Sequence, residues 1–244
     1  MLDHVVLENL LVIDVETAPV EPDLESLPKA MQDAWKSKAR KHCAEDVAPQ
    51  DYFFDRAAIF AEFGRIVCIS VGYFLKDDNS ADGLNFRIKS FSGREETPVL
   101  EGFIDLLNHP HFNKPEIRLA GHNIKEFDVP YICRRALVNG LMLPKILDIS
   151  GRKPWETNLV DTMNLWKFGD YKNYTSLALL TSLFGLPTPK DDIDGSEVGA
   201  VFWHEDDVDR ITRYCQKDVL AVAQLLLRFK GMPVLENEDV TIGD

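Results

Sequence analysis

The 244-residue sequence lacks features that define several large classes of protein. It has no apolar run long enough to span a membrane, and its N-terminus, M-L-D-H-V-V-L-E-N-L, has no basic region followed by an apolar stretch. We therefore expect a cytoplasmic protein with no membrane partner. The only cysteines are Cys43, Cys68, Cys133 and Cys215, and none belongs to a C-x-x-C pair. This spacing favours free thiols over a zinc site or a disulfide framework.

Positive charge is also scarce, because 27 Lys and Arg face 40 Asp and Glu, for a net charge of −13. Binding to phosphates normally leaves a basic footprint, so this balance argues against a nucleic-acid partner unless bound cations offset the acids locally. A few basic side chains could still contact a phosphate backbone, although the pattern favours a solvated surface charge for each one taken singly: Lys36, Lys38, Arg40, Lys41, Lys167, Lys172 and Lys190.

The 45% content of hydrophobic residues is sufficient for a large core. We expect one domain over residues 1–244, with a helical insertion at 21–63. Strands are expected at 10–15, 65–75, 85–91, 117–121 and 158–165, and helices from about 97 to 107, 128 to 140, 176 to 184 and 208 to 229. Thr97 is the expected N-cap of the first of these helices. The mixture predicts an α/β fold.

A pair of acids ends the first apolar run. Asp14 and Glu16 lie in L-V-I-D-V-E-T, and alternation along a strand places both side chains on one face. D-x-E alone is a weak signal, because two acids at the fraying end of a strand would look the same.

Two further acids lie in apolar helical patterns. Asp128 begins one helix, where it could simply cap exposed amides, and Asp218 interrupts the apolar stripe of the last helix. Tyr214 lies one turn before Asp218, so a structural Tyr-Asp hydrogen bond is the alternative there. Buried carboxylates need compensating charge, and converging acids therefore predict a site for two divalent metals. Asp161 is a lower-ranked candidate.

Three short motifs occur in order: D-x-E, then N-x-x-x-F-D from Asn123 to Asp128, then Y-x-x-x-D from Tyr214 to Asp218. Together they resemble the motifs of the DEDDy 3′-5′ exonucleases, above all the proofreading exonuclease domain of family B DNA polymerases in its stand-alone bacterial form. The resemblance runs from about Leu10 to Phe229. It implies a ribonuclease H-like α/β fold, with a mixed five-stranded sheet and helices on both faces. Arg213 stands where the DEDDh branch has histidine, which favours the tyrosine branch.

The resemblance also implies roles for individual residues. Asp14, Glu16 and Asp218 would hold the cation that activates water, and Asp14 and Asp128 the cation near the leaving oxygen. Tyr214 would orient the water. The cations would be Mg²⁺ or Mn²⁺, which prefer oxygen ligands. The substrate-binding candidates are Asn123, Phe127 and Lys190.

The expected activity is release of nucleoside 5′-monophosphates from the 3′ end of a single strand, with DNA favoured over RNA. The alternative is a ribonuclease H-like module that binds nucleic acid or protein without cutting. The pathway (repair, end processing or proofreading in trans), a protein partner in trans and the oligomeric state stay open. Some aromatic residues could stack on bases, although an aromatic is more often part of a core: Phe53, Phe54, Trp155, Trp166 and Trp203.

Overall fold

The computed structural model describes residue 2 and residues 4–42, 47–76, 83–153, 156–170, 172, 174–187 and 192–243. Three residues singled out above, Cys43, Trp155 and Lys190, lie outside the described residues. None of the described helices combines the length and the apolar composition that spanning a membrane requires.

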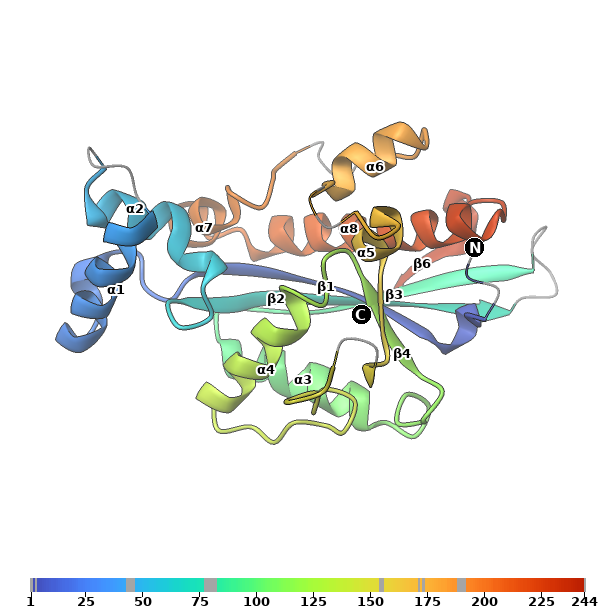
Figure 1. Cartoon of the computed structure of the whole chain (residues 1–244), viewed down its shortest axis with the longest axis horizontal. Coiled ribbons are helices and arrows are strands. Elements are labelled where there is room, and N and C mark those ends of the chain that lie inside the picture. Colours follow the sequence, from blue (N-terminus) through green and yellow to red (C-terminus); the bar gives the residue numbers. More distant parts are fainter. Residues whose placement is uncertain are drawn as a thin grey trace.

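A mixed sheet forms the centre of the described structure, with strand order β5-β4-β1-β2-β3-β6 (Figure 1). The strands are β1 (Leu10–Pro19), β2 (Gly64–Lys76), β3 (Leu84–Ser92), β4 (Arg118–Gly121), β5 (Leu159–Asp161) and β6 (Val240–Gly243). β1, β2 and β3 form an antiparallel meander, whereas β4 pairs parallel with both β1 and β5. The antiparallel meander beside parallel strands confirms the expected mixed α/β sheet.

Helices cover both faces of this sheet. The α-helices are α1 (Lys29–His42), α2 (Pro49–Arg56), α3 (Glu96–Asn108), α4 (Asp128–Val138), α5 (Thr162–Lys167), α6 (Leu177–Leu183), α7 (Val198–Ala200) and α8 (Val208–Lys230). Short helices of other types are η1 (Leu7–Asn9), η2 (Leu24–Ser26), η3 (Ala57–Ile59), η5 (Val201–Glu205) and η6 (Asn237–Asp239). In Figure 1, α8 runs along one face and α3 and α4 lie against the other.

Strand alternation decides which side chains of β1 meet which helices. Leu11, Ile13 and Val15 join the core cluster that includes residues of α3 and α4. Leu10 and Val12 pack instead with residues of α8. Because alternate residues share a face, Asp14 points to the α8 side of the sheet.

Three local predictions were wrong. The sheet has a sixth strand, because β6 pairs parallel with β3 after a polar segment that carries no strong strand pattern. The strand expected at 158–165 stops at Asp161, whose carboxylate accepts hydrogen bonds from the amides of Met163 and Asn164 and so begins α5. Thr97 is not the N-cap of α3, since the helix starts at Glu96.

The segment at 21–63 contains α1, α2 and η3, which pack around Trp35. The indole is fully buried and contacts Phe53 and Phe63 edge-on, with ring centroids 5.2 and 5.0 Å away. The hydroxyl of Thr17 in β1 and that of Tyr131 in α4 both donate to the carbonyl oxygen of Ala58. These bonds fix η3 against the end of β1. That the segment is an insertion into the fold stays a prediction.

A buried ion pair joins α3 to α4. The guanidinium of Arg135 donates to both carboxylate oxygens of Glu96, at 2.8 and 2.6 Å, and to the carbonyl oxygen of Ala61 at 2.9 Å. Glu96 also accepts from the amide of Ile66 at 2.7 Å and from the side chain of Asn139 at 2.9 Å. Each charge therefore has several partners, as burial requires.

Candidate functional site

The two acids of β1 lie beside the middle of α8. Asp14, Glu16 and Cys215 each place a potential metal-ligating atom within 4.8 Å of the others. Asp14 is half-buried, whereas Glu16 is buried. Glu16 also precedes an irregularity in the pairing of β1 with β2, between Glu16 and Thr17, which bends the end of the strand. The two carboxylates thus form a close pair at the α8 face of the sheet.

The thiol of Cys215 hydrogen bonds with Asp14. It lies 3.3 Å from the Asp14 carboxylate oxygen Oδ2 and 3.4 Å from the Asp14 carbonyl oxygen, and it donates to both. Burial raises the pKa of this thiol well above its usual value, so it stays a protonated donor and a poor ligand for a hard cation. No sequence pattern indicated this role. Among the described cysteines, Cys68, Cys133 and Cys215 are free thiols, as expected.

Tyr214 and Asp218 come from successive turns of α8, and both are buried. The Tyr214 hydroxyl hydrogen bonds with the Asp218 side chain. Burial, followed by the charges of Asp218 and Glu16, raises the pKa of this phenol, so Tyr214 is neutral at physiological pH and its hydroxyl can donate. Helical spacing thereby brings the motif's tyrosine and acid to the same side as Asp14.

Asp128 reaches the same region from the opposite side of β1. It is the first residue of α4, is buried, and accepts a hydrogen bond from the amide of Val15. Burial raises its pKa to about 7. Asp128 therefore does more than cap the start of α4, since its carboxylate contacts the strand that carries Asp14 and Glu16.

The acids raise one another's pKa values. Burial is the main cause for both Asp14 and Glu16, followed by the charge of Asp218 for Asp14 and that of Asp14 for Glu16. The ion pairs of the described residues include none to Asp14, Glu16 or Asp128. Several close carboxylate oxygens that lack a Lys or Arg ion pair fit a divalent cation, which prefers such ligands. The acidic cluster, which comprises Asp14, Glu16, Asp128 and Asp218, is thus a candidate metal site.

The loop before Asp128 is held by Asp161, which the sequence ranked only as a possible site acid. Its carboxylate accepts from the amides of Asn123 and Lys125, at 3.1 and 3.2 Å, besides capping α5. Asn123 adopts a left-handed backbone conformation with φ of 65°. Asp161 is thus engaged in shaping this loop. The adjacent His122 bonds to the Thr162 hydroxyl and the Thr175 carbonyl oxygen.

A hollow of about 280 Å³ opens beside Glu16. Phe127 lines it from one side, and Phe54, Arg56 and Ile59 from the 21–63 segment line it from another. Phe54 is stacked on His204, with ring centroids 5.0 Å apart. The other described aromatic candidates do not line this hollow. Phe53 belongs to the Trp35 cluster, Trp166 packs against Phe184, and the Trp203 indole donates to the Pro19 carbonyl oxygen.

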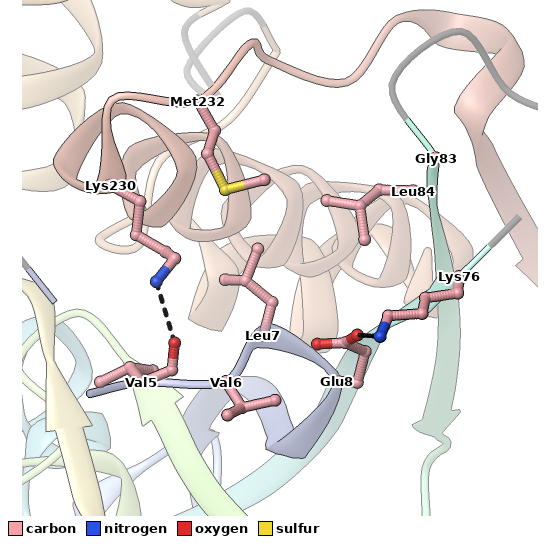
Figure 2. Close-up of a pocket in the computed structure, with 9 residues that line it drawn as sticks. All are labelled: Val5, Val6, Leu7, Glu8, Lys76, Gly83, Leu84, Lys230 and Met232. Carbon is pink, nitrogen blue, oxygen red and sulfur yellow. Dashed lines mark hydrogen bonds and ion pairs between the residues drawn. The ribbon is translucent and has the colours of Figure 1, made fainter. Parts of the chain in front are cut away.

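A second hollow, of about 380 Å³, lies where β1 begins (Figure 2). Its two ammonium groups already have partners, because Lys76 pairs with Glu8 at 2.9 Å and Lys230 donates to the carbonyl oxygens of Leu2 and Val5. Six residues of strand, about 20 Å, separate the first residue of β1 from Glu16. This hollow is therefore distinct from the acidic cluster.

The fold is ribonuclease H-like. A solved structure with this fold is the family B DNA polymerase from the hyperthermophilic archaeon Pyrobaculum calidifontis, which matches with a TM-score of 0.53 and 18% identity. The match covers 90% of this chain and 24% of the polymerase chain, so this chain spans about a quarter of the polymerase's length. A search of curated proteins finds no match.

Residues 59–239 match the family described as predicted 3′-5′ exonucleases related to the exonuclease domain of PolB, and the chain belongs to this family. This confirms the resemblance to the exonuclease domain of family B DNA polymerases, and membership of an exonuclease family implies a nucleic-acid substrate. The matched range contains Asp128, Tyr214 and Asp218, whereas Asp14 and Glu16 precede it. The tertiary structure therefore brings Asp14 and Glu16 next to acids that lie within the matched range.

Proposed function

We propose that this protein is a metal-dependent 3′-5′ exonuclease of the DEDDy type, which releases nucleoside 5′-monophosphates from single-stranded ends, DNA being favoured over RNA. The observation that carries the proposal is the convergence of Asp14 and Glu16 with Tyr214 and Asp218 across the interface of β1 and α8. Asp128 completes the set from α4. A cytoplasmic location stays part of the proposal.

Each side chain has a part that follows from its place. Asp14, Glu16, Asp128 and Asp218 would hold two divalent cations, Mg²⁺ or Mn²⁺. Bound there, the cations would supply positive charge beside the attacking water and the departing 3′ oxygen. Tyr214 would orient the water through its neutral hydroxyl, because a phenol with a raised pKa is a poor general base.

The hollow beside Glu16 is the proposed position of the terminal nucleoside. Phe127 offers an aromatic surface there and Arg56 a positive charge, both next to the acid. Asn123, five residues before Asp128, would contact the strand. Lys190 stays a substrate-binding candidate from sequence alone.

The test is degradation of a single strand that carries a label at either end. With Mg²⁺ or Mn²⁺, 5′-labelled DNA should give a ladder that shortens stepwise, and 3′-labelled DNA should release labelled mononucleotide at once. EDTA should stop both reactions. The same pair of labels on RNA measures the DNA preference. Absence of cleavage under every condition would instead support the alternative of a module that binds without cutting.

Metal binding should stabilise the protein increasingly as pH rises. The pKa of Asp128 is raised to about 7, and those of Asp14 and Glu16 are raised well above normal. A carboxyl with a raised folded-state pKa stabilises fully below its unfolded pKa and loses this contribution as pH rises through the folded value. Cations replace these protons, so saturating Mg²⁺ should raise Tm by about 5–10 °C at pH 8 and far less at pH 5.

Thermal melts with EDTA and with Mg²⁺ at each pH measure this difference directly. The other titrating groups affect the Tm of both melts equally, so their effect cancels in the difference. Asp14→Asn should shrink the Mg²⁺-dependent shift. A shift that is largest at pH 5, or that persists undiminished in Asp14→Asn, would place the cation elsewhere.

Tyr214→Phe should lower kcat by about 10- to 100-fold, since it removes one hydrogen bond to a reacting group, worth roughly 1.5–3 kcal/mol. The ring remains, so its packing in the cluster that includes Val67 and Phe202 is preserved. Steady-state turnover on labelled DNA measures the loss, and the Mg²⁺-dependent rise in Tm should be retained. Unchanged turnover would remove Tyr214 from the mechanism.

A further inference from the structure

An exposed tyrosine stands beside the loop of the second motif. Tyr174 lies between α5 and α6 and is 64% exposed. Its hydroxyl hydrogen bonds with the side chain of Asn123, and the charges of Glu126 and Asp161 reach it strongly enough to help raise its pKa, after the effect of burial. The ring is therefore tied by one end to the loop that leads to Asp128, while most of its surface faces water.

The end of α5 places a cation over this ring. The ammonium of Lys167 lies 5.2 Å from the centroid of Tyr174. A cation in this position is attracted to one face of the aromatic ring. The arrangement leaves the rest of the exposed ring for another planar group and keeps a positive charge over one face, in a chain whose net charge is −13.

The residue after Lys167 is a second exposed aromatic. Phe168 is 78% exposed and has a left-handed backbone conformation with φ of 44°. For a bulky residue this conformation is strained, and burial of the ring does not offset the strain here. Strain of this kind that persists at an exposed position often has a functional origin.

We propose that Tyr174 and Lys167 form a platform that binds the single strand next to the acidic cluster, with a base stacked on the Tyr174 ring and a phosphate beside the Lys167 ammonium. This inference rests on the proposed function and extends it, because it names the surface that receives nucleotides behind the terminal one. Stacking suits every base, so the platform gives affinity without sequence preference.

The occupant is a nucleic-acid strand because the two groups match its two repeating features, a planar base and an anionic phosphate. The neighbouring helix α6 also exposes Leu179 and Leu183, at 52% and 62%, which a protein partner could cover. Those leucines offer no charge for a phosphate. The platform therefore does not include these leucines, and parent-like DNA affinity of Tyr174→Ala would favour a protein partner for this surface.

The test measures binding of fluorescein-labelled oligothymidylate by anisotropy in EDTA, so that no cleavage occurs. Tyr174→Ala should weaken binding by about 5- to 100-fold, the usual loss for one stacked base. Tyr174→Phe keeps the ring and should bind within about twofold of the parent protein. Lys167→Ala should lower the slope of log affinity against log salt by about 0.7, the contribution of one phosphate contact on a single strand.

Two surface variants serve as matched controls. Met142→Ala removes an 86% exposed apolar side chain and Lys145→Ala an exposed ammonium, and both should bind like the parent protein. Thermal melts of each variant check that the fold is intact.

Parent-like affinity of Tyr174→Ala would overturn the platform and leave the exposed surface to a protein partner. Equal weakening by Tyr174→Phe and Tyr174→Ala would also overturn it, because the hydroxyl contact with Asn123 would then account for the loss. Failure of the proposed function is distinguishable, since it appears as absence of 3′-end cleavage by the parent protein with Mg²⁺ or Mn²⁺, whereas the binding series requires no metal.

Discussion

Asp14→Asn should lower the rate of 3′-end removal by about 10³-fold or more. Asp14 lies within 4.8 Å of Glu16 and beside Asp218 and Asp128, so it is the acid that would contact both cations. Loss of a shared ligand forfeits several kcal/mol of charge stabilisation in the transition state, and about 4 kcal/mol corresponds to 10³ in rate. Initial rates on 5′-labelled single-stranded DNA at saturating Mn²⁺ and Mg²⁺ measure the loss.

The asparagine is nearly the same size as aspartate and can still accept from the Cys215 thiol, so the fold should survive. Relief of repulsion among the acids should even raise the Tm of the metal-free variant. Asp105→Asn, which removes an exposed acid from α3, is the matched control and should keep full activity. Activity of Asp14→Asn within tenfold of the parent protein would refute the two-cation assignment.

Arg135→Met should destabilise the protein by about 3–5 kcal/mol. The substitution leaves the buried Glu96 carboxylate without its guanidinium, and an uncompensated buried charge costs this much. For a chain of this size the loss corresponds to a fall in Tm of roughly 10 °C. Urea unfolding at pH 7, followed by circular dichroism, gives the free energy of unfolding.

Arg134→Met is the matched control, because the neighbouring guanidinium is exposed and should contribute less than about 1 kcal/mol. The double variant Glu96→Leu, Arg135→Met removes both charges and should be more stable than Arg135→Met alone. If the double variant is the less stable of the two, the loss comes from packing of the long side chain and not from the unpaired carboxylate.

Much of the architecture was predictable because periodicity is a local property. The run before Asp14 predicts a buried strand, and the stripe of α8 predicts a helix with Asp218 facing inward; the structure has both. The strand expected at 158–165 failed, because the side chain of Asp161 begins a helix where the pattern continued as apolar. β6 was missed because its four residues become a strand only by pairing with β3.

The site divides in the same way. Residue types and motif order predicted Asp14, Glu16, Asp128, Tyr214 and Asp218 as site residues. The signal was local, because acids within apolar strand and helix patterns would be buried and would need a compensating charge. The Cys215 thiol beneath Asp14, the Asp161 carboxylate beneath the Asn123 loop and the cation over Tyr174 could not be foreseen. Each is a contact between elements far apart in the chain, and no local pattern encodes it.

Motif order thus predicted the exonuclease family, which the family match confirms, and alternation and helical spacing predicted which acids share a face. How close those acids come, and what surrounds them, depends on how distant segments of the chain pack. Their distances depend on the pairing of β1 with β2 and on the packing of α8 across β1. Burial and mutual repulsion, which raise the pKa values of the acids, arise only once these elements meet.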